Sequence, residues 1–325
     1  MIIAGDDELE KQTLKEKLAT QFEMKDLGKL KYFLGIEVAY SRQGIFIFQR
    51  KYILDLLKEI GKLDCMITGV PIEQNHKTEN DEESPKVEKA QYQRFVEKLI
   101  HLSHTKPDIA YAVSVVSQFM HDPRERHLQA ISMIIQYLKA SPGKGLLLKK
   151  EGILSMKVYT DADYAGSIID RRSTSGYCMF LGENLVTWRS DKPQFDVQHD
   201  RTKHVEIDRH FIKEKLDNGL IATKYIPSRL QLADMFTKGL PIEHLKDLTC
   251  KLGMIDIHQQ THIQGKKALP LIASDAELSA FAYTCVWTSM LLALSRLPSE
   301  YNETTNCNKL NCEVFRNSLS LFTLY

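Results

Sequence analysis

The chain has 325 residues, of which 43% are hydrophobic and 26% are charged, so it can bury a sizeable core. At ~100–200 residues per domain, this length suggests two domains with an appendage. Lys and Arg number 43 against 42 Asp and Glu, a formal charge of +1. This composition shows none of the overall basic surplus common in nucleic-acid-binding proteins, so any polyanion site has to be a local patch.

The spacing of the cysteines and the N-terminal sequence indicate in which cellular compartment the protein is expected. The six cysteines show no CxxC spacing and no His pair at the spacing of zinc ligands. The first residues lack the basic region and long apolar run of a secretory signal peptide. We therefore expect an intracellular protein, cytoplasmic or nuclear and not secreted.

The N-terminal part of the chain is expected to contain both strands and helices. A helix over 6–22 has apolar residues near one face, and Gly61 closes a second, amphipathic helix. Between them, Ser41-Arg42-Gln43 joins two strands into a hairpin. The full set is a strand at 1–4, a helix at 6–22, strands at 30–40 and 44–49, and a helix at 51–60.

The middle of the chain is expected to be helical. Residues 73–86 are polar and charged, which is typical of a loop or linker. Helices are predicted over 87–103, 109–121 and 126–139, the last two after Pro-containing starts. Ser141-Pro142-Gly143 ends this block.

Residues 152–240 have the pattern of one α/β domain. The predicted elements are a strand at 154–159, a hairpin of 176–181 and 184–190 across Gly182-Glu183, a helix at 200–216, a strand at 221–226 and a short helix at 228–237.

The tail from 257 differs in character because it contains a mostly apolar stretch over 276–297. About 20 such residues can span a bilayer. The stretch is rich in Ser, Thr and Ala, which weakens its interpretation as a membrane span. We therefore favour the interpretation that this sequence was never selected to fold with the rest of the chain, and a membrane anchor is the alternative.

A series of sequence blocks, in order and at similar spacing, resembles copia-type retrotransposon Pol polyproteins. They are LKYFLGIEV (30–38), QRKYILDLL (49–57), YQRFVEKLIHLSHTKPDIAYAVSVV (92–116), YLKASPGKG (137–145), YTDADYAG (159–166), DRRSTSGYCMFLGENLVTW (170–188) and LADMFTK (232–238). The resemblance covers roughly 1–254. It implies the rear of a reverse transcriptase followed by a ribonuclease H domain.

The resemblance also implies a division of the chain and an α+β/α/β fold class. We expect a helical thumb- and connection-like region, then an incomplete ribonuclease H-like mixed sheet with flanking helices. The predicted segments are 1–72 (rear of the reverse transcriptase, palm edge and thumb-like), 73–86 (linker), 87–151 (connecting helices), 152–256 (ribonuclease H-like, lacking its middle) and 257–325 (unrelated or disordered tail).

In the family, the polymerase motif Tyr-Val-Asp-Asp directly precedes a segment like residues 1–7. The pair Asp6 and Asp7 is therefore not expected to be the catalytic pair, and the carboxylates that hold two metal ions in a polymerase are expected to be absent.

Two ribonuclease H carboxylates carry over from the family. Asp161 matches the first metal-binding acid, at the end of a strand, and Asp234 matches the last. Taken by themselves, Asp161 can be a turn former and Asp234 a surface residue in a helix's first turn. The cofactor of such a site in the family is Mg²⁺.

The middle two acids of the family pattern are not found. Relative to the family pattern, several tens of residues are missing after Trp188, including the helix and strand that carry those acids. The sequence supplies other acids nearby, but nothing places them at the missing positions: Asp196, Asp200, Glu206 and Asp208. We therefore expect Mg²⁺ not to be bound productively and this copy to be catalytically inactive.

Two further interpretations concern the binding of zinc and of nucleic acid. The imidazoles of His204 and His210 are six residues apart, which does not suit a helical zinc pair. Arg201 and Lys203 are candidates to touch a phosphate backbone, although interleaved acids favour a solvated helix face. The expected partner is an RNA–DNA hybrid or duplex, with no small-molecule substrate. A non-enzymatic nucleic-acid-binding remnant and a membrane-anchored product through 276–297 are the alternatives.

Overall fold

The computed structural model describes residues 7–23, 28–74, 76, 84–150, 155–162, 174–191, 217–219 and 222–256. The predicted strand at 1–4, the predicted helix at 200–216 and the apolar stretch at 276–297 lie outside these residues. Among the described helices, each is too short or too polar to cross a bilayer.

The first helix confirms the prediction for 6–22. Helix α1 (Glu8–Gln21) begins at Asp7, whose Oδ1 accepts hydrogen bonds from the backbone N–H groups of Leu9 at 2.8 Å and Glu10 at 3.0 Å. This is an N-cap, and it satisfies two donors that the helix leaves unpaired. Leu9 on the predicted apolar face is 77% exposed, so that face is not buried.

The predicted hairpin is confirmed, but its first strand is broken. Strands β2 (Ile36–Tyr40) and β3 (Gly44–Phe48) pair antiparallel. The short strand β1 (Tyr32–Phe33) folds back on β2 through Leu34 and Gly35, with φ of +48° and +80°. Glycine adopts a positive φ without steric cost, which explains its presence at the second of these two turn positions.

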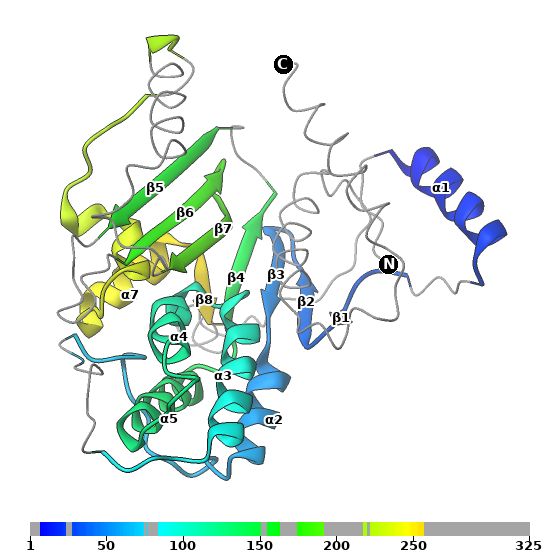
Figure 1. Ribbon diagram of the computed structural model, residues 1–325. Coiled ribbons are helices and arrows are strands. Elements are labelled where there is room, and N and C mark those ends of the chain that lie inside the picture. The colour runs from blue at the N-terminus through cyan, green and yellow to red at the C-terminus, as the bar shows by residue number, and fades with distance from the viewer. Residues whose placement is uncertain are drawn as a thin grey trace, which may run out of the picture. The chain divides into compact units, whose positions relative to one another are not determined.

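Two strands that the sequence analysis did not predict complete this sheet. Strands β4 (Lys144–Lys149) and β8 (Met254–Asp256) give a five-stranded antiparallel sheet in the order β1-β2-β3-β4-β8 (Figure 1). Gly145 lets β4 approach β3, because a Cβ there would lie 2.2 Å from the Ile47 carbonyl oxygen. The predicted segments 1–72, 87–151 and 152–256 therefore contribute strands to one sheet.

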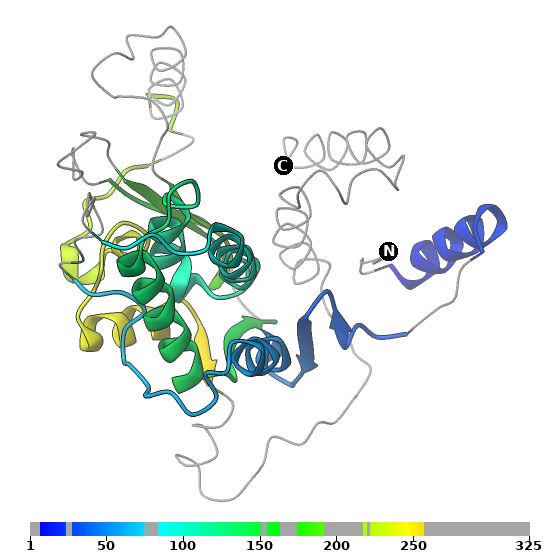
Figure 2. The same cartoon turned by 60° about the horizontal axis from the view of Figure 1, so that its bottom comes forward.

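The helix predicted at 51–60 and the helices predicted in the middle of the chain are confirmed, together with a short 3₁₀ helix that was not predicted. They are α2 (Arg50–Glu59), α3 (Lys89–Ser103), η1 (Pro107–Ile109), α4 (Ala110–Ser117) and α5 (Glu125–Ala140). Figures 1 and 2 show α2, α3 and α5 side by side, and α4 packs against α3 and α5. Their apolar faces meet around fully buried Ile53, Leu99 and Ile134.

A buried polar cluster joins these helices to β4. The Asp108 carboxylate accepts a hydrogen bond from the Tyr137 hydroxyl at 2.8 Å and lies 3.4 Å from Lys144 Nζ. Lys106 Nζ donates to the Lys144 carbonyl at 3.1 Å, and Lys106 is only 1% exposed. Charges buried this deeply have to be paired, so the cluster ties the helices to the start of β4.

A second, three-stranded sheet contains the other predicted hairpin. Strands β5 (Met156–Ala162), β6 (Ser175–Leu181) and β7 (Asn184–Asp191) pair antiparallel in the order β5-β6-β7. Helix α4 packs against β7, and Trp188 Nε1 donates to the Ser103 carbonyl at 3.0 Å. The sheet is thereby fixed to the helical core.

The predicted strand at 221–226 is wrong for the residues described there. Residues 222–227 form no helix or strand, and residues 222–225 are exposed, so they lack the one-sided burial of a strand. The chain then forms the 3₁₀ helices η2 (Ser228–Leu230) and η3 (Leu232–Phe236), where a short helix was predicted, and helix α7 (Ile242–Lys251).

The fold class is confirmed at its coarser level, as helices combined with β-sheets. In the part of the chain that the structure describes, every strand pairing is antiparallel, so the predicted mixed sheet is not seen there. One apolar core runs from Ile53 to Met254 and includes residues of both sheets.

Candidate functional site

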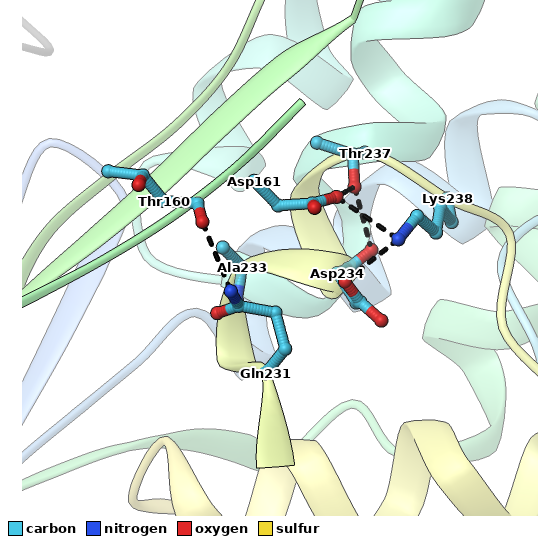
Figure 3. Close-up of polar contacts among 7 residues, drawn as sticks. All are labelled: Thr160, Asp161, Gln231, Ala233, Asp234, Thr237 and Lys238. Carbon is cyan, nitrogen blue, oxygen red and sulfur yellow. Dashed lines mark hydrogen bonds and ion pairs between the residues drawn. The ribbon is translucent and has the colours of Figure 1, made fainter. Parts of the chain in front are cut away.

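The candidate site lies where the 3₁₀ helix η3 packs beneath the C-terminal end of β5 (Figure 3). β5 supplies Asp161, and η3 with the two residues after it supplies Asp234, Thr237 and Lys238. The structure thus brings together the two carboxylates that the sequence singled out, although they are far apart in the chain.

A glycine opposite Asp161 makes this approach possible. Gly176 of β6 pairs with Asp161 across the ladder. A Cβ at Gly176 would lie 2.6 Å from Phe236 Cβ and 3.0 Å from Thr237 Cγ2. Any larger residue there would push η3 away from the strand that carries Asp161.

The start of η3 is tied to the backbone of β5 by one side chain. Gln231 Nε2 donates to the Thr160 carbonyl at 3.1 Å, while its Oε1 accepts from the Ala233 N–H at 3.3 Å. The same amide therefore caps η3 and sets its position against the residue next to Asp161 (Figure 3).

Lys238 bridges the two carboxylates. Its Nζ lies 2.9 Å from Asp234 Oδ1 and 3.2 Å from Asp161 Oδ2. The Thr237 hydroxyl donates to the same Oδ2 of Asp161 at 2.5 Å. One oxygen of Asp161 thus faces both a cation and a hydroxyl donor (Figure 3).

The site is half open to solvent. The side chain of Asp234 is 7% exposed and that of Asp161 20%, whereas that of Lys238 is 45% exposed. Burial lowers the pKa of Lys238, but hydrogen bonds to Asp234 and Asp161 and their charges outweigh burial and raise it. The ammonium form is therefore the one that the site holds at neutral pH.

Within the described ranges, no group of three or more His, Cys, Asp or Glu side chains is placed to hold a metal ion. Several sequence candidates fall outside those ranges, and the structure gives them no position: Asp196, Asp200, Arg201, Lys203, His204, Glu206, Asp208 and His210. They stay predictions.

Sequence reasoning missed Thr237, Lys238, Gln231 and Gly176. The block at 232–238 contained a signal, because Lys238 follows Asp234 by four residues, a spacing at which opposite charges meet on a helical turn. Nothing local marks Gly176 or Gln231, because their roles depend on contacts between β5, β6 and η3.

Comparison with known proteins identifies the class. Residues 1–74 match the family described as "Reverse transcriptase (RNA-dependent DNA polymerase)". No solved structure matches the chain. The N-terminal part is therefore reverse transcriptase-like.

Relatives extend the match through most of the chain. The Retrovirus-related Pol polyprotein from transposon RE1 of Arabidopsis thaliana is 30% identical over 307 residues, covering 78% of this chain and 21% of that protein. The polyprotein from transposon TNT 1-94 of Nicotiana tabacum is 26% identical, covering 74% of this chain and 23% of that protein. An uncharacterized mitochondrial protein of Arabidopsis thaliana is 35% identical, covering 58% of this chain and 77% of that protein.

The chain therefore belongs to the family of copia-type, retrovirus-related Pol polyproteins from transposons. It spans about a fifth of the length of the transposon polyproteins that it matches.

Proposed function

We propose that the chain is a remnant of the polyprotein region that holds the rear of the reverse transcriptase and a ribonuclease H domain, and that it does not cleave RNA–DNA hybrids. The observation that carries the proposal is the site itself. Asp161 and Asp234 meet at the end of β5, but the cation between them is Lys238. The proposed setting is intracellular, cytoplasmic or nuclear.

The described residues do not by themselves fit the Mg²⁺ ions that the family implies. Phosphodiester hydrolysis with two metal ions about 3.5–4 Å apart needs several carboxylates converging on them. The described residues supply two, and both are paired with Lys238. We therefore derive no catalytic step through a metal ion.

Of the acidic pair near residue 7, the structure describes Asp7, and this residue serves as a helix cap. Asp7 Oδ1 caps α1 by accepting from two backbone N–H groups. A carboxylate engaged in this way acts as a helix cap, which supports the prediction that it is not part of the polymerase centre.

A cleavage assay tests this proposal. The full chain is incubated with an RNA–DNA hybrid and Mg²⁺ or Mn²⁺, beside Asp161→Asn. We expect the two proteins to give the same background, because the residues that the structure describes form no complete metal site. Cleavage by the unmodified chain that disappears in Asp161→Asn would refute the proposed inactivity.

A second candidate function is nucleic-acid binding without chemistry, and an exposed aromatic residue favours it. The Tyr32 ring of β1 is 52% exposed, and Lys51 Nζ lies 5.6 Å from its centroid. Aromatic rings beside cations are stacking platforms for single-stranded nucleic acids. Lys31, the preceding residue, is also exposed and adds a second positive charge to this segment.

This candidate predicts binding of single-stranded RNA or DNA that weakens with added salt. Tyr32→Ala should weaken it by about 1–3 kcal/mol, the range for loss of one stacked base. Tyr225→Ala is the matched control, because Tyr225 is 85% exposed. Equal losses for both variants, or binding that salt does not change, would exclude a specific platform at Tyr32.

A further inference from the structure

Lys238 occupies the position between two carboxylates that a metal ion would need. Its Nζ contacts Asp234 Oδ1 at 2.9 Å and Asp161 Oδ2 at 3.2 Å, so one ammonium group joins side chains from η3 and β5. We infer that Lys238 is the resident cation of this site and excludes divalent metal ions from the Asp161–Asp234 pair. The inference rests on the proposed function, since it explains why the remnant carboxylates are inert.

The geometry of the site does not allow the Lys238 ammonium group and a Mg²⁺ ion to be bound between the carboxylates at the same time. Mg²⁺ binds carboxylate oxygens at roughly 2.0–2.1 Å in a near-octahedral shell. An ion bridging Asp161 Oδ2 and Asp234 Oδ1 would fill the space that the ammonium group occupies (Figure 3). Metal binding at these oxygens therefore requires Lys238 to leave.

The charges in the site also disfavour the binding of a divalent metal ion. Two carboxylates carry two negative charges, and Lys238 neutralises one of them. The Thr237 hydroxyl, at 2.5 Å, also competes for Asp161 Oδ2. Mg²⁺ gives up its water reluctantly, so a pair with this reduced charge and an occupied oxygen attracts it weakly.

The backbone keeps Lys238 close to both acids. Asp234 and Thr237 are 5% and 1% exposed, and the Thr237 N–H donates to the Asp234 carbonyl at 3.3 Å. The Lys238 N–H donates to the same carbonyl at 3.1 Å. Only the side chain of Lys238 can move away, and doing so would leave two carboxylates facing each other without a cation.

Mn²⁺ titration of the full chain, followed by the paramagnetic resonance signal of free Mn²⁺, tests the inference. Lys238→Met removes the charge and keeps the length of the side chain. Lys238→Arg keeps the charge and is the matched control. Asp161→Asn in the Lys238→Met background reports whether binding is at this site.

The unmodified chain and Lys238→Arg should show no Asp161-dependent Mn²⁺ binding. Lys238→Met should gain binding at least about tenfold tighter, because a unit charge beside the site is lost, and Asp161→Asn should abolish the gain. Asp161-dependent binding by the unmodified chain that matches Lys238→Met would overturn the inference, as would a folded Lys238→Met variant that gains none.

A second measurement does not depend on a variant that folds. In ¹⁵N-lysine spectra of the unmodified chain, the side-chain signal assigned to Lys238 should not shift with millimolar Mg²⁺; a saturable shift would overturn the inference. The cleavage assay separates the two proposals. An inactive chain in which Lys238→Met gains no Mn²⁺ site refutes only the role of Lys238, whereas an active unmodified chain refutes the proposed function.

Discussion

At the scale of single residues, the carboxylate of Asp108 is a buried charge that the helical core has to keep paired. Its side chain is fully buried, beside Lys106 and Lys144, and it accepts from the Tyr137 hydroxyl. Burial raises the pKa of Asp108, but the two lysine charges and the hydrogen bonds lower it by more, so the net direction is down. The structure therefore depends on a charged Asp108.

The first prediction concerns acid stability. A carboxyl with a folded pKa below its unfolded value of 3.8 stabilises the fold above that pH, and this contribution is lost as pH falls through the folded pKa. Asp108→Asn should remove that part of the pH dependence below 3.8. It should also cost roughly 3–5 kcal/mol at neutral pH, because buried Lys106 and partly buried Lys144 lose their anionic partner.

Urea unfolding at a series of pH values measures both effects. Asp247→Asn is the control, because Asp247 is 54% exposed in its pair with Lys251 and should cost no more than about 1 kcal/mol. If Asp108→Asn costs no more than this control, the buried cluster does not have the role assigned to it.

The places of Asp161 and Asp234 in the fold could be predicted from their neighbours in sequence, whereas their role as metal-binding acids stays a prediction. Asp161 stands near the end of a strand inside a recognisable block, and Asp234 opens a short helix. Lys238 was missed although it lies in the same block as Asp234. Its contact with Asp161 depends on how η3 packs on β5, which no local pattern encodes.

At the scale of elements, the approach of η3 to β6 sets the site. The second prediction is that Gly176→Ala lowers the free energy of unfolding by about 1–3 kcal/mol through overpacking against Phe236 and Thr237. It should also expose the amides of 232–237 to faster hydrogen exchange. Ser175→Ala, one residue earlier in β6, should change stability by no more than about 0.5 kcal/mol. Equal effects of the two changes would argue against the close contact at Gly176.

The elements that the sequence predicted are those with local signals. Helices α2, α3 and α5 show apolar periodicity, and both hairpins have polar or Gly-containing turns. Strands β4 and β8 were missed because each pairs with a strand far away in sequence. Residues 222–225 of the strand predicted at 221–226 are exposed, and no described strand pairs with them.

At the scale of the whole described core, both sheets and the helices share one apolar interior. The third prediction uses Leu248 of α7, which is 0% exposed and belongs to the same cluster as Ile53. Leu248→Ala should cost about 2–5 kcal/mol. Because the core is continuous, hydrogen exchange should show β3 and β6 losing protection together.

Leu9→Ala provides the control for this prediction, since Leu9 is 77% exposed and its removal should cost no more than about 0.5 kcal/mol. A Leu248→Ala variant in which β6 loses protection while β3 keeps it would show that the sheets do not unfold as one unit.

We expect Lys238, and not a metal ion, to join Asp161 to Asp234. A crystal structure of the full chain grown with Mn²⁺, with anomalous scattering data collected at the manganese absorption edge, tests it most directly. We expect the Lys238 ammonium group between the two carboxylates and no anomalous peak bound to either. An anomalous peak bridging Asp161 and Asp234, with Lys238 turned away, would contradict the account.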